Sequence, residues 1–229
     1  MILTWYGHSC VHIVTSDGVK IIVDPFINGN PTCPVSVDDI DVDYIILTHG
    51  HNDHVGDTVE ISKRCHAPVI GMVELCDFLE ETFQLETIGA NIGGKLVGNF
   101  GSVKFTQAIH SSSYVHEGKA YYMGLAAGII LDDGATKVYH AGDTAFFGDM
   151  AHIGPVDLAF LPIGDKYTMG IEEALKASEL IQADTFIPVH YNTFSALKQN
   201  PYHYINQLPE ANGFVPEIGR PFNESCIYL

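Results

Sequence analysis

Residues 48–54, which read Thr-His-Gly-His-Asn-Asp-His, constrain this chain more than any other segment. They place three histidines and one aspartate within six residues, and packing alone gives no reason for so many metal-ligating side chains in one short loop. The preceding residues, 44–47, are apolar and typical of a buried strand. We therefore expect the loop to begin where a core strand ends, with a rigid support behind it. Four such groups can hold two adjacent divalent ions if the rest of the chain supplies further ligands.

Length and composition predict a single domain over residues 1–229. The hydrophobic fraction of 46% is ample for a core, and no linker, low-complexity run or break in composition divides the sequence. No segment approaches the roughly 18 uninterrupted apolar residues of a membrane span, and the strand-like start has no features of a signal peptide. The five cysteines are scattered and form no Cys-x-x-Cys pair, so we expect free thiols and a cytoplasmic location.

The charge balance bears on the class of partner. The chain has 28 acidic and 11 basic residues, which give a formal net charge of −17. Binding to a phosphate backbone requires clustered lysine and arginine, and here that clustering is limited to the pair Lys63 and Arg64. A nucleic-acid substrate is therefore disfavoured, although a local basic patch is compatible with a negative total.

Apolar patterning predicts a mixed sequence of strands and helices. Segments 2–6, 10–15 and 18–23 are typical of a β-meander, and residues 27–41, with Gly, Asn and Pro, are typical of a loop. Helices are predicted at 56–65, 72–83, 170–182 and 201–208. Further strands are predicted at 102–109, 121–131, 137–140, 157–163 and 184–189. Similar Asp-then-apolar patterns begin near residues 42, 156 and 183, as expected if related strands end along one edge of a layered fold, although chance similarity would also explain them.

Three further candidate ligands each follow an apolar strand. His110 follows 103–109, Asp143 follows 138–142 and His190 follows 186–189. With His49, His51, Asp53 and His54 they make five imidazoles and two carboxylates. This donor set suits zinc, manganese, iron, cobalt or nickel, whereas calcium prefers oxygen ligands. For His110, which three serines follow, ordinary loop chemistry is the alternative.

These motifs, in this order, resemble the metallo-β-lactamase fold superfamily, and the resemblance covers nearly the whole chain. Within it the chain is similar to a group of metal-dependent hydrolases related to the ascorbate-phosphate lactonases. The segments that carry this finer resemblance are 6–9 (Tyr-Gly-His-Ser), 108–113 (Ala-Ile-His-Ser-Ser-Ser), 139–144 (Tyr-His-Ala-Gly-Asp-Thr) and 161–170. The resemblance implies an α/β fold, a four-layered αβ/βα sandwich of two mixed sheets with helices on the outer faces.

The resemblance also implies roles for the candidate ligands. One of two divalent transition-metal ions would be held by His49, His51 and His110, the other by Asp53, His54 and His190, and Asp143 would bridge both. In β-lactamases of this superfamily the position of Asp143 is usually Cys, which points away from antibiotic hydrolysis. In the flavodiiron oxidoreductases the position of His51 is usually Glu, so His51 favours hydrolysis over oxygen chemistry.

Further roles follow by the same resemblance. A hydroxide bound by both ions would attack the substrate while Asp53 orients it. His8 would act at the site as a substrate contact or proton donor, with a structural histidine as the alternative. Asp24 would accept a hydrogen bond from a ligand histidine, and Thr48 would also lie behind the ligands. His116 and Lys166 are candidate substrate contacts, with a solvated loop as the alternative for His116.

The function that we expect is metal-dependent hydrolysis of an ester, lactone or phosphodiester bond in a small molecule. The alternatives are a nuclease of the same fold and a non-catalytic metal-binding or redox protein. The acidic charge and the lack of an RNA-binding arm oppose the nuclease. The sequence leaves homo-oligomerisation open and gives no sign of a membrane partner.

Overall fold

The structure is a computed structural model that describes residues 1–208 and 212–227. Its N-terminal half forms a six-stranded sheet in the order β1-β2-β3-β4-β5-β6. The strands are β1 (Ile2–Trp5), β2 (Val11–Val14), β3 (Lys20–Val23), β4 (Tyr44–Ile46), β5 (Val69–Met72) and β6 (Thr87–Ala90). β1 to β3 form the predicted meander, and β3 to β6 are parallel.

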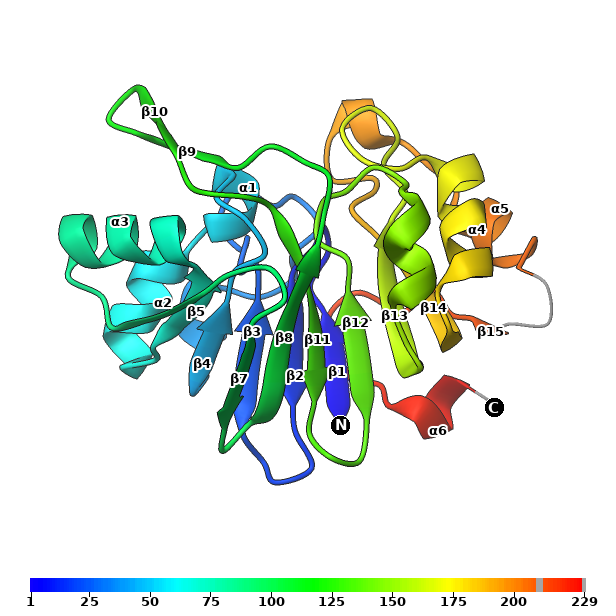
Figure 1. Ribbon diagram of the computed structural model, residues 1–229, viewed down its shortest axis with the longest axis horizontal. Coiled ribbons are helices and arrows are strands. Elements are labelled where there is room, and N and C mark those ends of the chain that lie inside the picture. Colours follow the sequence, from blue (N-terminus) through cyan, green and yellow to red (C-terminus); the bar gives the residue numbers. More distant parts are fainter. Residues whose placement is uncertain (209–211, 228–229) are drawn as a thin grey trace.

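The C-terminal half forms a seven-stranded mixed sheet in the order β15-β14-β13-β12-β11-β8-β7. Its strands are β7 (Lys95–Gly98), β8 (Gly101–Gln107), β11 (Ala127–Asp132), β12 (Lys137–His140), β13 (Val156–Pro162), β14 (Ala183–Val189) and β15 (Asn212–Gly213). A separate hairpin of β9 (Ser113–His116) and β10 (Lys119–Tyr122) leaves the body of the molecule between β8 and β11 (Figure 1).

The helices lie on the two flanks of the molecule (Figure 1). α1 (Asn52–Val55), α2 (Thr58–Cys65) and α3 (Val73–Phe83) lie beside the first sheet, and α4 (Ile171–Leu180) and α5 (Pro201–Ile205) beside the second. α6 (Glu224–Ile227) lies near the C-terminus, and three short 3-10 helices cover Val37–Asp39, Gly148–His152 and Ser195–Leu197. None of the helices in the described part of the chain has the length and apolar character needed to cross a membrane.

Two apolar clusters hold these layers together. The larger contains side chains from both sheets, such as Trp5 and Phe105, together with Ala174 and Ala177 of α4. The smaller lies between the first sheet and its helices and includes Leu75 and Leu79 of α3, spaced one helical turn apart. The resulting order of helices, sheet, sheet and helices confirms the predicted four-layered sandwich.

The structure corrects several predicted elements. The single strand expected at 121–131 is divided between β10 and β11, because the chain turns at Gly124 with a φ of +77°, a conformation that L side chains rarely adopt. The expected helix at 56–65 is α2, which begins at Thr58, and a further short helix, α1, lies within the expected histidine loop. Sequence patterning missed β5, β6 and β7, whose short runs of four residues have no clear alternation of apolar and polar side chains.

Strand direction explains why the candidate ligands meet. β1 and β3 run the same way because each is antiparallel to β2, and β4 is parallel to β3. In the second sheet β8 and β12 are both antiparallel to β11, and β13 and β14 are parallel to β12. Within each sheet the carboxyl ends of these strands therefore lie at one edge. The segments that follow them carry His8, Asp24, residues 49–54, His110, Asp143 and His190.

Candidate metal centre

Three imidazoles from two loops form the first ligand group. His49 and His51 follow β4, and His110 follows β8. Nδ1 of His51 lies 3.0 Å from Nε2 of His49 and 3.3 Å from Nε2 of His110. The other ring nitrogen of His51 lies 3.3 Å from the hydroxyl of Ser111, which holds the ring in this orientation. The three nitrogens thus converge on one point.

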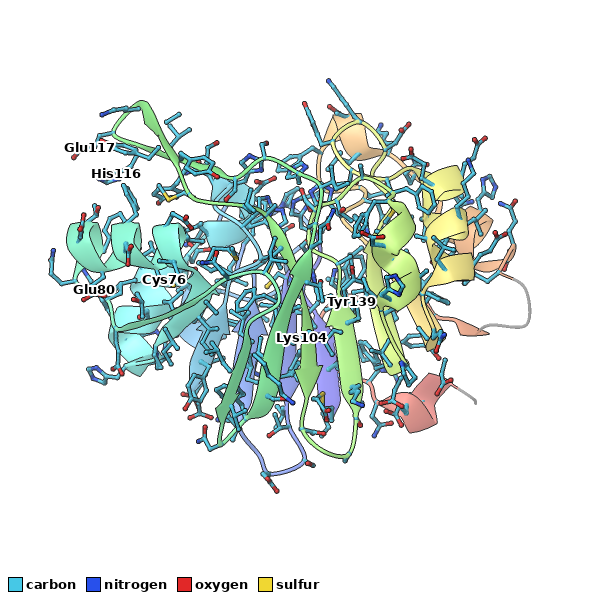
Figure 2. All side chains as sticks on the ribbon, in the orientation of Figure 1. Cys76, Glu80, Lys104, His116, Glu117 and Tyr139 are labelled. Atoms are coloured by element: carbon cyan, nitrogen blue, oxygen red, sulfur yellow. The ribbon has the colours of Figure 1, made fainter. Side chains whose placement is uncertain are left out.

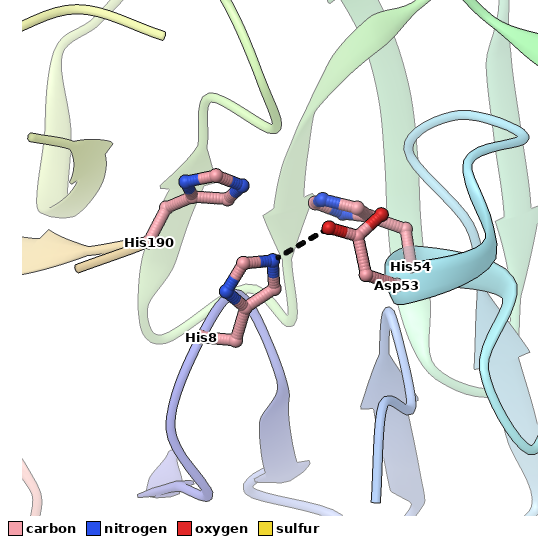
Figure 3. A group of neighbouring side chains, drawn as sticks. All are labelled: His8, Asp53, His54 and His190. Carbon is pink, nitrogen blue, oxygen red and sulfur yellow. Dashed lines mark ion pairs between the residues drawn. The ribbon is translucent and has the colours of Figure 1, made fainter. Parts of the chain in front are cut away.

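A second group lies beside the first and includes a residue from the start of the chain. Ligand atoms of His8, Asp53, His54 and His190 lie within 4.8 Å of one another. Figure 3 shows these four side chains pointing toward a common centre from the loop after β1, from α1 and from the end of β14. The sequence predicted Asp53, His54 and His190 together, and the structure adds His8.

Asp143 lies between the two groups. Its Oδ2 atom is 3.0 Å from Nε2 of His190, 3.6 Å from Nε2 of His110 and 4.0 Å from Nε2 of His49. Its Oδ1 atom is 3.4 Å from Nε2 of His54. Both groups of nitrogens therefore face the same buried carboxylate.

Asp24 and Thr48 orient two of these histidines from behind. The buried Asp24 carboxylate accepts hydrogen bonds from the Thr48 amide at 2.9 Å, from the Thr48 hydroxyl at 2.6 Å and from Nδ1 of His54 at 2.8 Å. Because the Thr48 hydroxyl has donated its only proton, it accepts from Nδ1 of His49, 3.0 Å away. When each ring carries a single proton, both therefore present an unprotonated Nε2 to the centre. Asp24 and Thr48 thus lie where the sequence predicted them, behind the ligand histidines.

His8 lies in the second ligand group rather than on the wall of the cavity. It is completely buried and does not line the cavity described below, so the geometry does not support a substrate contact. Its Nε2 atom is 3.2 Å from Oδ2 of Asp53, and its Nδ1 atom is 3.0 Å from the Thr193 hydroxyl. Its carbonyl accepts hydrogen bonds from the Trp5 indole and the His190 amide. His8 therefore connects Asp53 to the strand end that carries His190.

The two predicted substrate contacts lie apart from the ligand groups. His116 is on the β9–β10 hairpin above α3, where its ring packs 5.1 Å from the ring of Phe83 (Figure 2). His116 does not line the cavity described for the ligand groups, and a substrate contact by this residue stays a prediction. Lys166 does not line the cavity either, and its Nζ atom lies 5.2 Å from the centre of the Tyr167 ring, which does.

Sequence reasoning missed several residues that fix the ligand loops. The Ser112 hydroxyl accepts from the Gly50 amide and donates to the Met123 carbonyl, which ties the histidine loop to the segment after β10. The Thr144 hydroxyl accepts from the Ile109 amide and so joins the loops of Asp143 and His110. The three serines after His110 and the Thr after Asp143 were the available signals, but a hydroxyl residue in a loop does not reveal its partner.

A cavity of about 520 Å³ opens directly onto the ligand groups. Its polar lining comes from His51, Asn52, Asp53, His110, Ser111, Asp143 and His190, and its remaining lining is Tyr167, Phe194 and Leu197. The volume is in the usual range for small-molecule sites.

A sequence model described as the Beta-lactamase superfamily domain matches residues 19–191. The chain belongs to the β-lactamase superfamily. It is 47% identical over 211 residues to a UPF0173 metal-dependent hydrolase of Enterococcus faecalis, which covers 91% of this chain and 94% of the relative. A second UPF0173 metal-dependent hydrolase, from Geobacillus thermodenitrificans, is 48% identical and covers 96% of each chain.

Solved structures place this superfamily member among metallo-hydrolases. Igni18, a metallo hydrolase from the archaeon Ignicoccus hospitalis, superposes with a TM-score of 0.85 at 35% identity and covers 97% of this chain and 98% of its own. The isothiocyanate hydrolase from Delia radicum gut bacteria superposes at 0.74 with 18% identity, covering 97% and 98%, and shares the fold. The protein is therefore a metal-dependent hydrolase with a His/Asp cluster able to bind metal.

The geometry of this superfamily member fits a metal ion. Neighbouring nitrogen ligands that each lie about 2.0–2.1 Å from one ion are roughly 3.0–3.4 Å apart, and the first group shows 3.0 and 3.3 Å. Nε2 of His54 and Nε2 of His190 in the second group, and Oδ1 of Asp143 between the groups, are buried and make no hydrogen bond of acceptable geometry among the described residues, although the Asp143 carboxylate lies 3.0–3.4 Å from the two nitrogens. Buried polar atoms are normally paired, so these three atoms are available as ligands.

Protonation in this member of the superfamily also favours a cation. Burial lowers the pKa of His49, His51 and His110, so these rings are neutral and offer lone pairs. Burial alone would also lower the pKa of His54, but the carboxylates of Asp143 and Asp24 outweigh it and raise this pKa well above its usual range. The two buried carboxylates thus create a negative potential that either a proton on His54 or a metal ion at the same place neutralises.

Proposed function

We propose that the protein uses two divalent ions, such as zinc or manganese, to hydrolyse an ester, lactone or phosphodiester bond in a small molecule. The observation that supports this proposal is the position of Asp143. Its carboxylate faces His49 and His110 of one group and His54 and His190 of the other within 4.0 Å. One carboxylate between two convergent ligand groups is the arrangement required to bridge two ions.

The chain supplies the rest of the site. Bound divalent ions would acidify a water molecule and polarise the substrate oxygen. Asp53 lines the cavity with a carboxylate whose Oδ2 atom is held against His8, so it can orient a water molecule and accept its proton. Although burial would raise the pKa of Asp53, the hydrogen bond from His8 and the charge of His54 lower it, which keeps this carboxylate ionised.

The first experiment is the metal content of protein produced with manganese or zinc. We expect close to two ions per chain, and Asp143→Asn should lose at least one of them together with activity on aryl esters, lactones and aryl phosphodiesters. Asp184→Asn is the matched control, because Asp184 is exposed at the start of β14, away from the ligand groups. A single ion per chain in the unaltered protein, or full metal content and activity in Asp143→Asn, would contradict the bridging role.

A further inference from the structure

Three residues of the cavity lining, Tyr167, Phe194 and Leu197, carry rings or alkyl groups and form its apolar wall. Tyr167 comes from the segment between β13 and α4, and Phe194 and Leu197 come from the segment after β14. Every other lining residue is polar, and all but Asn52 and Ser111 belong to the proposed ligand set. A molecule whose reacting bond lies at the ligands therefore places its remaining atoms against the exposed rings of Tyr167 and Phe194.

This apolar wall is held in place rather than collapsed into the core. The Phe194 ring lies 6.1 Å from the Phe26 ring and 5.5 Å from the His8 ring, and yet 38% of the residue remains exposed. Tyr167 is 56% exposed at the same cavity, whereas Leu197, which also lines the cavity, is fully buried. When an apolar ligand covers exposed apolar surface in a concave site, the removal of that surface from water favours binding.

The same cavity offers no obvious place for a charged group. Its lining, within the described residues, contains neither lysine nor arginine, and it includes the carboxylates of Asp53 and Asp143. Lys166 is adjacent in sequence to Tyr167, its Nζ atom lies over the Tyr167 ring, and the residue is exposed. A phosphate or sulfate group remote from the ligands would thus lose hydration without gaining a cationic partner, in a chain whose net charge is −17.

We infer that the substrate is an uncharged ester or lactone whose acyl or alcohol portion is an alkyl or aryl group. This inference rests on the proposed function and narrows it. The ligand groups receive the carbonyl, and the exposed rings of Tyr167 and Phe194 receive the apolar portion. A phosphorylated sugar lactone, although chemically hydrolysable, does not match this wall.

The test uses metal-loaded protein and p-nitrophenyl esters from acetate to octanoate, with bis(p-nitrophenyl) phosphate alongside. We expect kcat/KM to rise by roughly fourfold for each methylene that the wall covers. Phe194→Ala should flatten this dependence, so that the ratio of kcat/KM for octanoate to kcat/KM for acetate falls. The control is Tyr202→Ala, which removes an exposed aromatic ring that does not line the cavity and should keep the full dependence. Equal kcat/KM across the ester series, or a preference for the phosphodiester, would overturn the inference.

A binding measurement separates the two proposals. If none of the esters, lactones or phosphodiesters is cleaved, the proposed function fails, and the wall is tested by calorimetric titration of acetate, hexanoate and inorganic phosphate. Tighter binding of hexanoate than of acetate, lost in Phe194→Ala, supports the apolar wall irrespective of turnover. Equal affinity for acetate and hexanoate refutes it, and the phosphate titration serves as the control for anion binding at the ligand groups.

Discussion

Replacement of Asp24 by Asn tests how the fold sets the protonation of a candidate metal ligand. Asp24 has a φ of +47°, which Asn tolerates better than most residues, so the substitution changes chemistry with little change in backbone strain. The carboxylate accepts three hydrogen bonds, two from Thr48 and one from Nδ1 of His54. An amide has one oxygen acceptor, and its nitrogen only donates.

The consequence for His54 follows from this count. If the amide oxygen keeps the bond to the Thr48 backbone, the amide NH2 faces Nδ1 of His54, which must then accept. The imidazole proton moves to Nε2, the atom that faces Oδ1 of Asp143 at 3.4 Å, and blocks it as a ligand. Loss of such an orienting partner typically lowers metal affinity about 10- to 100-fold. The unsatisfied buried donors should also lower the free energy of unfolding by about 1–3 kcal/mol.

Metal affinity is measured by competition with a chromophoric chelator, and stability of the metal-free protein by urea unfolding. Asp184→Asn again serves as the control for loss of one carboxylate. The reasoning would be refuted by an Asp24→Asn protein that binds both ions within twofold of the unaltered affinity. Equal losses in Asp24→Asn and the control would show that net charge, rather than the His54 tautomer, is responsible.

Three other outcomes are expected. A Cβ at Gly50 would lie 2.5 Å from Cβ of Met123. Gly50→Ala should therefore lower the free energy of unfolding by about 1–3 kcal/mol and also lower the metal content. An unchanged urea midpoint would contradict this. Burial raises the pKa of Cys76 to about 12, whereas Cys226 is exposed, so thiol labelling of the folded protein at pH 8 followed by peptide mapping should modify Cys226 and spare Cys76. Burial also raises the pKa of Tyr204 above its unfolded value of about 10. The neutral phenol of Tyr204 therefore contributes fully to stability below pH 10, and this contribution is lost as pH rises above 10. Tyr204→Phe should make the decline of the unfolding free energy between pH 10 and 11.5 shallower, and identical slopes in the two proteins would refute the assignment.

Local sequence order was sufficient to predict where the candidate ligands follow the strands. An apolar run followed at once by His or Asp predicted the strand ends at His49, His110, Asp143 and His190, because a buried strand must end where polar side chains begin. The order of these motifs also indicated the superfamily, which the relatives confirm. All five cysteines are free, in line with the absence of a paired spacing.

Other features depended on contacts between segments far apart in the chain. His8 meets Asp53 and Thr193 because the segments that follow β1, β4 and β14 converge, although β14 belongs to the other sheet. The β9–β10 hairpin, which carries His116 away from the site, was hidden within a polar loop pattern. Short edge strands such as β6 and β7 are stabilised by their neighbours in the sheet, and their own sequences give little sign of it.

The sequence by itself determined which side chains are available as ligands and the order in which strands deliver them, because both follow from local periodicity and residue chemistry. The tertiary structure decided which ring nitrogen of His51 faces the centre, which residues line the apolar wall and where His8 lies. Those properties depend on distances between loops that are separated by up to 185 residues, and the pairing of strands within two sheets, rather than any local pattern, sets those distances.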